Sequence, residues 1–187
     1  MKAEGSGVPA VPEQNGLMMN VEVREVPEQL VVTEERVVNQ AELLEWLPGA
    51  MSRVAKLADG LGGVAGTTEW AYLRRGDWPD EPVIIVIYEG NPNEGPVPVE
   101  VCAPLRAGAE KPVNEPTRVI PAHREAYTRV TKGTVESGQL GAVYETVEQW
   151  AGRNGLEIAA APREVYWTDF MSAAPSDDVL DVAWPVE

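Results

Sequence analysis

The side chains best suited to chemistry lie in segment 163–170, where a glutamate alternates with an aromatic residue and a hydroxyl residue. In an extended strand, Glu164, Tyr166 and Thr168 point to the same face, because successive side chains alternate. A carboxylate among aromatic rings is poorly hydrated and attracts a cationic ligand. A strand glutamate is more often exposed than buried, so the segment by itself also fits the outer face of a sheet. Both interpretations remain open from the residues alone.

Two further carboxylates, Glu100 and Asp181, occupy matching positions in a repeated stretch of sequence. Segment 99–105 returns in looser form as segment 180–186, and each acid is the second residue of its copy. If Asp181 lies beside Glu164 across the last predicted hairpin, the pair selects cations more strongly and can also act as an acid/base pair. The duplicated acids fit equally well on the polar outer face of an antiparallel sheet. Strand register decides between these hypotheses, because a shift of one residue turns every side chain to the other face.

Four aromatic residues are candidates for the walls of a cation site. Each cation–π contact contributes roughly 0.5–2 kcal/mol, so several rings beside one carboxylate can hold a flat cationic ligand. Core packing is the alternative, and for Tyr144 on the apolar stripe of a predicted helix the two interpretations are equally supported. The separation between Trp70 and Glu164 is the same as that between other repeated residues, so the two occupy equivalent positions in the two copies. This predicts an aromatic ring on one side of the site and an acid on the other. The candidate rings are Trp70, Tyr72, Tyr127 and Tyr144.

The elements that must position these residues also occur in two copies. Segment 23–27 is echoed by 117–121, and segment 71–73 by 165–167. Each copy is predicted to form strand, helix, strand and strand, which gives an α+β fold with an antiparallel sheet, both helices on one face and a ligand cleft at the pseudo-dyad. The predicted parts are a disordered tail at 1–19 and one domain at 20–187, divided into repeat one (20–105), a linker (106–116) and repeat two (117–187).

Local signals place the individual elements. Asn39 with Glu42 three residues later resembles a capping box, and apolar residues at helical spacing predict a helix from there to a cluster of glycines. Pro48 should kink or restart this helix. Ser137 is the predicted N-cap of the second helix, which the Asn-Gly pair at 154–155 should end. Alternating and β-branched segments predict strands at 21–26, 30–38, 69–74, 83–88, 99–105, 118–130, 163–170 and 179–186.

Composition excludes several classes of function. The formal net charge is −15, the opposite of what phosphate neutralisation requires, so direct nucleic-acid binding is not expected. The chain has one cysteine and one histidine, which rules out an internal disulfide and argues against a zinc site. We find no glycine-rich phosphate loop and no serine-elbow motif, and we predict neither a metal nor a cofactor. Because the sequence shows no signal peptide and no apolar run long enough to span a membrane, the expected location is the cytoplasm.

Segment 162–169 carries a resemblance to a known family. Together with an acidic residue and Pro185-Val186 in the closing strand, it is similar to the GyrI-like, or AraC-type effector-binding, domain. Gly133 ahead of the second predicted helix fits the same pattern, although Val135 stands near the place where family members often have an aromatic residue. The resemblance covers residues 20–187 and implies the duplicated fold.

The resemblance also implies a function and the residues of a site. Members of this family bind hydrophobic, often aromatic and cationic, drugs at the interface of the two repeats. They place a buried glutamate at the position that Glu164 matches and a second pocket acid at the position that Asp181 matches. The domain occurs behind DNA-binding helices in transcription regulators and also alone. Since only a short tail precedes it here, we expect a stand-alone binder that senses or sequesters a drug or a metabolite.

Two other functions remain open. Some stand-alone relatives hydrolyse strained electrophilic natural products with pocket glutamates, and here Glu164 with Glu100 or Asp181 could do so, one carboxylate steering water. Other relatives act on DNA gyrase, and the acidic charge would suit the basic DNA-binding surface of gyrase or of a regulator as protein partner.

Overall fold

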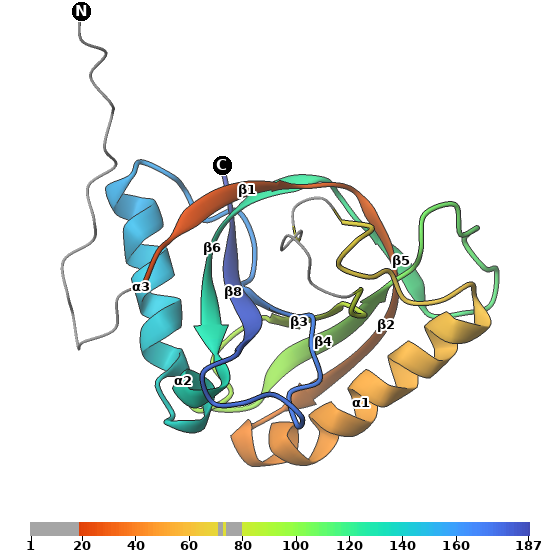
Figure 1. The fold of residues 1–187 in the computed structure, drawn as a ribbon, viewed down its shortest axis with the longest axis horizontal. Coiled ribbons are helices and arrows are strands. Elements are labelled where there is room, and N and C mark those ends of the chain that lie inside the picture. Colours follow the sequence, from red (N-terminus) through yellow and green to blue (C-terminus); the bar gives the residue numbers. More distant parts are fainter. Residues whose placement is uncertain (1–18, 71–72, 74–79) are drawn as a thin grey trace, which may run out of the picture.

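One open sheet of antiparallel strands forms the body of the protein (Figure 1). The computed structural model describes residues 19–70, 73 and 80–187, so the predicted tail at 1–19 lies outside the described residues except for Met19. Within the described part the sheet has eight strands, which confirms the predicted α+β class. The elements are β1 (Glu22–Val26), β2 (Gln29–Val38), α1 (Gln40–Gly60), β3 (Ile84–Tyr88), β4 (Val97–Pro104), β5 (Thr117–Ile120), β6 (His123–Thr131), α2 (Lys132–Glu136), α3 (Leu140–Arg153), β7 (Arg163–Tyr166) and β8 (Asp178–Val186).

The strand order of the sheet is symmetric. From one edge to the other it runs β1-β6-β8-β7-β3-β4-β2-β5. If β1 is matched with β5, β2 with β6, β3 with β7 and β4 with β8, the order is the same from either edge. A pseudo-twofold axis therefore passes between the central strands β3 and β7.

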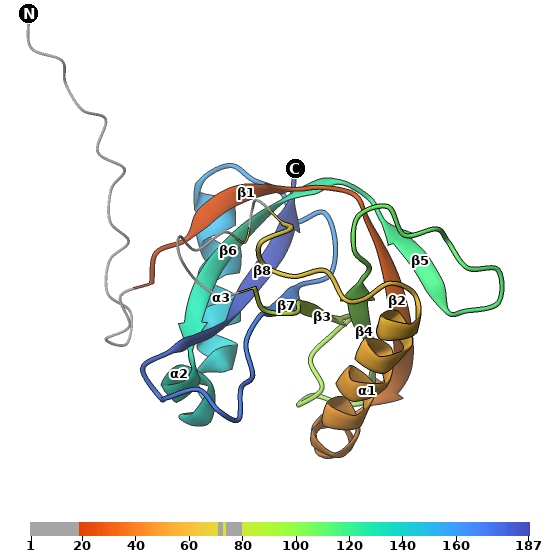
Figure 2. The same cartoon turned by 45° about the vertical axis from the view of Figure 1, so that its right-hand side comes forward.

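Two bent strands cross from one half of the sheet to the other. β1 continues into β2 through Pro27, and β5 continues into β6 through Pro121. Proline lacks the N–H that a sheet ladder needs, so the chain can bend there without losing a bond. β1 pairs with β6 and β5 pairs with β2, so each half places its first strand on the sheet of the other half. Figure 2 shows these two bent strands as an arch.

The first helix begins with the capping box that the sequence predicts. The side chain of Asn39 accepts a hydrogen bond from the backbone N–H of Glu42, and the Glu42 carboxylate accepts one from the N–H of Asn39, both at 3.0 Å. α1 then runs through Pro48 as one helix, so the predicted restart does not occur. None of the described helices is long and apolar enough to cross a membrane.

Both faces of the sheet are covered. On one face, which we call the helix face, α1 packs over β2 and β4, and α3 packs over β6 and β8. Tyr166 of β7 packs against both of these cores. The opposite face, which we call the far face, carries a third core that includes Val31, Ile85, Trp167 and Leu73. The prediction that both long helices lie on one face is confirmed.

Some predicted boundaries are wrong. Ser137 ends the short helix α2 and does not begin α3, because Gly138 adopts a positive φ of 75° and separates the two helices. The N-cap of α3 is Gln139. β7 ends at Tyr166, before the predicted end at 170. In the predicted strand at 69–74, the described residues Glu69, Trp70 and Leu73 do not form a strand, and the other three lie outside the described residues.

Candidate functional site

Glu164 lies at the centre of the sheet, on its helix face. β7 lies between β3 and β8, and Glu164 sits opposite Val86 of β3 and Val182 of β8. Directly opposed residues of an antiparallel pair share a face, and both valines belong to the cores beneath the helices. Glu164 is only 4% exposed. A carboxylate therefore lies in the interior of the protein, where the two halves of the sheet meet.

Three tyrosine hydroxyls converge on this carboxylate. Tyr166, on the same strand, donates a hydrogen bond to Oε2 of Glu164 at 2.6 Å, and Tyr88 of β3 donates to the same oxygen at 3.0 Å. Tyr144 of α3 donates to Oε1 at 2.8 Å. Three elements, β3, α3 and β7, thus supply one hydrogen-bond cluster, which we call the tyrosine cluster.

The surroundings of the tyrosine cluster destabilise the negative charge on Glu164. Burial raises the pKa of the Glu164 carboxyl, and the bonds from Tyr166, Tyr144 and Tyr88 lower it by less. Burial and the neighbouring carboxylate raise the pKa of all three tyrosines well above 10.0, so the hydroxyls stay protonated and act as donors. Within the described residues, no arginine or lysine forms an ion pair with Glu164. Among the described residues, the hydroxyl dipoles of the tyrosines are what balances the negative charge.

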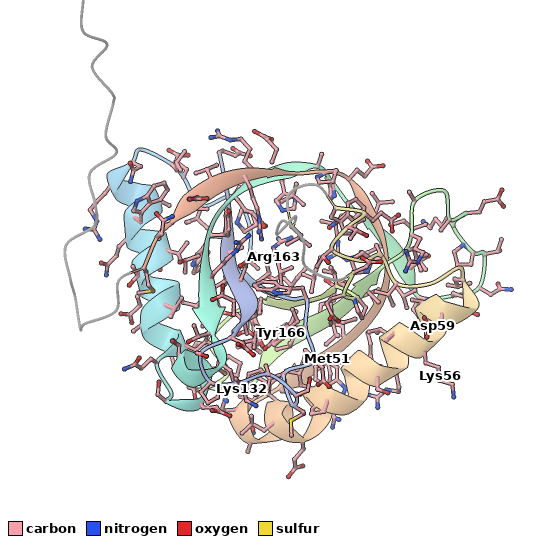
Figure 3. All side chains as sticks on the ribbon, in the orientation of Figure 1. Met51, Lys56, Asp59, Lys132, Arg163 and Tyr166 are labelled. Atoms are coloured by element: carbon pink, nitrogen blue, oxygen red, sulfur yellow. The ribbon has the colours of Figure 1, made fainter. Side chains whose placement is uncertain are left out.

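Aromatic rings surround the carboxylate. The ring of Tyr144 meets those of Tyr88 and Trp184 edge to face, with both centroid distances 6.4 Å. Tyr144, Tyr166 and Trp184 are partly exposed, so the cluster reaches the protein surface. In Figure 3, Tyr166 lies between Met51 of α1 and the α2 helix, whereas Arg163 of the same strand lies inside the arch. A buried carboxylate among aromatic rings is chemically suited to attract a cation.

The two duplicated acids do not join this cluster, and the hypothesis that they share a site with Glu164 is wrong. Asp181 sits opposite Val165, the neighbour of Glu164, and so points to the far face. Glu100 sits opposite Ile87, which in turn faces Arg163, and it also points to the far face. Sheet register thus separates both acids from Glu164 by the thickness of the sheet.

Both duplicated acids are partners of arginines. Arg24 of β1 binds Asp181 of β8 at 2.6 Å, and Arg118 of β5 binds Glu100 of β4 at 2.6 Å. Each pair joins an exchanged first strand to the closing strand of the other half. The acids therefore hold the two halves together.

The pair at Asp181 belongs to a larger buried network. Arg24 also binds Glu125 at 2.7 Å, and His123 contacts the other oxygen of that carboxylate. Burial by itself would raise the pKa of Glu125, but Arg24, His123 and Arg163 outweigh it and hold the pKa at about 2. This network is charge-paired, unlike the tyrosine cluster.

The remaining predicted aromatic residues lie elsewhere. Tyr127 is on the far face, where its ring lies 3.9 Å from the Arg24 guanidinium and its hydroxyl donates to Glu22. Trp70, in the turn region that precedes β3, packs against the far-face core. Tyr72 lies outside the described residues. Of the predicted rings, the structure brings Tyr144 and Tyr166 together with Glu164.

The predicted equivalence of Trp70 and Glu164 is also wrong. Glu100 and its counterpart Asp181 sit opposite Ile87 and Val165 respectively, which makes those two residues equivalent. One position earlier, Val86 is then the counterpart of Glu164. One position later, Tyr88 is the counterpart of Tyr166. Tyr88, which the sequence analysis missed, is therefore the repeat of Tyr166, which it found.

Metal-binding chemistry has no support in the described part of the chain, where no group of three or more histidine, cysteine, aspartate or glutamate side chains could hold an ion.

Comparison with known proteins identifies the fold. No family model matches the sequence, and no curated protein matches it. The C-terminal domain of EcmrR superposes with a TM-score of 0.66 at 19% identity, covering 91% of this chain and 99% of that one. The chain spans 57% of the EcmrR chain solved in complex with DNA.

Two further solved structures have the same architecture. SAV2435, solved bound to tetraphenylphosphonium, gives a TM-score of 0.53 at 10% identity, covering 90% of this chain and 94% of that one. A hydrolase encoded by lin2189 from Listeria innocua gives 0.54 at 10% identity, covering 89% and 91%. At these identities the likeness establishes a shared fold, in agreement with the resemblance to GyrI-like domains.

Proposed function

We propose that this protein binds hydrophobic cations, with Glu164 as the counter-charge and the tyrosine cluster as the aromatic wall. The observation that carries the proposal is the environment of Glu164. This carboxylate is 4% exposed, accepts hydrogen bonds from three hydroxyls and has no ion pair among the described residues.

A ligand cation can relieve the unfavourable burial of that charge. Attraction between opposite charges strengthens as water is excluded. The three hydroxyls are already oriented toward the carboxylate, so they need not reorganise when a cation arrives. Each aromatic ring adds cation–π attraction of roughly 0.5–2 kcal/mol. Charge, more than size, should therefore decide what binds.

The fold comparison supports this function. SAV2435, which shares the fold, is solved with tetraphenylphosphonium, an aromatic cation. We extend the proposal to a biological role in sensing or sequestering a cationic aromatic drug or metabolite.

Two ions of the same shape and opposite charge test the proposal on the wild-type protein. We expect tetraphenylphosphonium to bind and tetraphenylborate not to bind at matched concentration, because only the cation gains from Glu164. Isothermal titration measures both, and quenching of Trp184, which packs against Tyr144, offers a second signal. Equal binding of the two ions, or binding of neither, contradicts a carboxylate-based site.

The pH dependence of cation binding should follow the titration of Glu164. Because burial raises the pKa of this carboxyl above 4.5, the free protein keeps a proton there at pH values where an ordinary glutamate is ionised. A cation must displace that proton, so affinity should fall by about tenfold per pH unit below the pKa and level off above it. Replacing Tyr166 with phenylalanine removes the shortest bond that holds the pKa down, and it should move the midpoint to higher pH.

Dissociation constants for tetraphenylphosphonium, measured across this titration range, check the prediction. Tyr127→Phe is the matched control, since it removes a hydroxyl from the far face and should leave the midpoint unchanged. A midpoint that stays in place or moves down in Tyr166→Phe would show that another group controls binding.

The hydrolase alternative depended on a second carboxylate beside Glu164. Since Glu100 and Asp181 lie on the far face in ion pairs with arginines, that support is lost. The gyrase alternative rests on the family resemblance and the acidic charge, and no contact in the described structure adds to it.

We also propose that residues 20–187 form one binding unit made of repeats at 20–105 and 117–187, joined at 106–116. The symmetric strand order and the two equivalent arginine–carboxylate pairs support this division.

A further inference from the structure

The segment between β7 and β8 lies beside the tyrosine cluster. We call residues 168–177 the strap. Tyr166 points to the helix face and Trp167 is buried on the far face, so the chain is fixed at the point where the strap begins. Phe170 and Ala173 of the strap pack against the same core as Tyr144 and Tyr166. Figure 1 shows the strap running through the space between α1 and the α2–α3 pair.

Lys132, the first residue of α2, holds the strap through its side chain. Its ammonium donates to the carbonyl oxygens of Ala173 at 3.0 Å and Met171 at 3.4 Å. The same ammonium lies 5.2 Å from the centre of the Phe170 ring and 3.8 Å from Glu136. The Lys132 side chain is only 13% exposed, so these contacts are largely shielded from water. In Figure 3, Lys132 and Tyr166 lie on the same side of the sheet.

The backbone of α2 holds the other end of the strap. The N–H of Lys132 donates to the carbonyl of Asp177 at 2.9 Å, and the N–H of Gly133 donates to the carbonyl of Pro175 at 2.8 Å. The approach at Gly133 is close, because a Cβ added there would lie 2.9 Å from the Pro175 oxygen. Only glycine fits at this position without moving the strap.

The strap is held differently from the other elements around Glu164. The strands and long helices are fixed by continuous ladders and apolar cores. The strap has no ladder: it is held by Phe170 and Ala173 at the edge of the core, by turns within the strap and by these polar contacts to α2. Segments with few buried contacts open at the lowest free energy. A ligand that must reach a carboxylate with 4% exposure therefore finds its easiest route where the strap detaches.

We propose that the strap is a gate over the Glu164 site and that Lys132 and Gly133 are the positioning residues that keep it closed. This inference rests on the proposed function, since the gate admits the cation that Glu164 binds. If strap opening limits ligand exchange, then loosening the strap accelerates entry and exit together and changes affinity much less.

Gly133→Ala tests the gate without a change of charge. Its methyl group must push Pro175 away, whereas Gly141→Ala, the matched control in α3, adds a methyl group to open space. In stopped-flow fluorescence with tetraphenylphosphonium, we expect association and dissociation rates to rise by about tenfold each in Gly133→Ala, as for loss of one to two hydrogen bonds. The control should match the wild type. Lys132→Met should accelerate exchange in the same way.

Two measurements without ligand keep the gate testable even if tetraphenylphosphonium does not bind. Hydrogen exchange at the amides of Lys132 and Gly133 reports detachment of the strap, and labelling by a water-soluble carbodiimide reports access to Glu164. We expect both to accelerate in Gly133→Ala and in Lys132→Met. Three results would each overturn the gate. The first is unchanged carbodiimide labelling, and the second is unchanged amide exchange in both variants. The third is ligand rates like those of the wild type although the strap is detached. Absence of cation binding together with faster labelling would instead reject only the proposed function.

Discussion

Replacing Asp181 with asparagine should lower the free energy of unfolding by about 3 kcal/mol, because removal of one carboxylate from a buried ion-pair network leaves its arginine partners less well compensated. Asp181 is fully buried and binds Arg24 at 2.6 Å, and Arg129 approaches its other oxygen at 3.7 Å. Among the described residues, Glu125 would remain as a carboxylate bound to Arg24. The loss should loosen β1 in particular, since Arg24 is the residue that joins this strand to β8.

The repeat supplies a matched control for this prediction. Glu100→Gln removes the equivalent charge from the other half, but its partner Arg118 has a side chain that is 40% exposed. The Glu100 side chain is 13% exposed, but because Arg118 stays in contact with water, this variant should lose clearly less stability than Asp181→Asn. Urea unfolding of both variants measures the difference. Equal destabilisation, or none in Asp181→Asn, would mean that the buried network does not hold the halves together.

The sequence was sufficient to predict the fold because its local signals agree with one another. The capping box at Asn39 and the repeated segments 23–27 and 117–121, each of which ends at a proline, mark elements that the structure contains. The duplicated pattern predicted one antiparallel sheet with both helices on one face. Short helix α2 escaped prediction because five residues carry too little periodicity to detect.

The sequence could not predict on which face of the sheet each acid lies, because both faces of the sheet are buried. The helix face and the far face of the sheet both carry apolar cores, so hydrophobic alternation along β8 does not indicate which face a given residue joins. Register across β7 and β8 decides whether Asp181 neighbours Glu164. That register depends on the loop between the two strands, whose sequence does not specify it.

One signal in the sequence does separate the two kinds of acid. Arg24 and Arg118 occupy the same position in the repeated segments 23–27 and 117–121, so the duplicated acids come with duplicated arginines. Glu164 has no acidic counterpart, since the equivalent residue is Val86. A repeated charge with a repeated partner indicates structure, whereas a charge that breaks the repeat indicates a specific role.

Replacing Glu164 with glutamine should abolish cation binding and stabilise the protein at the same time. Loss of one partner of a desolvated charge pair weakens binding by about 2–5 kcal/mol, so we expect tetraphenylphosphonium affinity to fall at least about 30-fold. Glutamine keeps the shape of glutamate, and its amide can still pair with the three hydroxyls once two of them turn to accept. Glu100→Gln, which makes the same change on the far face, should bind the cation like the wild type.

The gain in stability follows from the direction of the pKa shift. Because the pKa of Glu164 is raised in the folded state, folding is favoured when this carboxyl is protonated, and that stability is lost as pH rises through the raised pKa. Glutamine stays neutral at every pH, so at pH 7 the variant should melt about 2–4 °C higher, the shift that ~1 kcal/mol gives in a chain of this size. The advantage should vanish below pH 4.5, where glutamate is protonated in both states. A variant that melts lower than the wild type at neutral pH would show that the ionised carboxylate stabilises the fold, and the buried charge would then not be one that a ligand is needed to relieve.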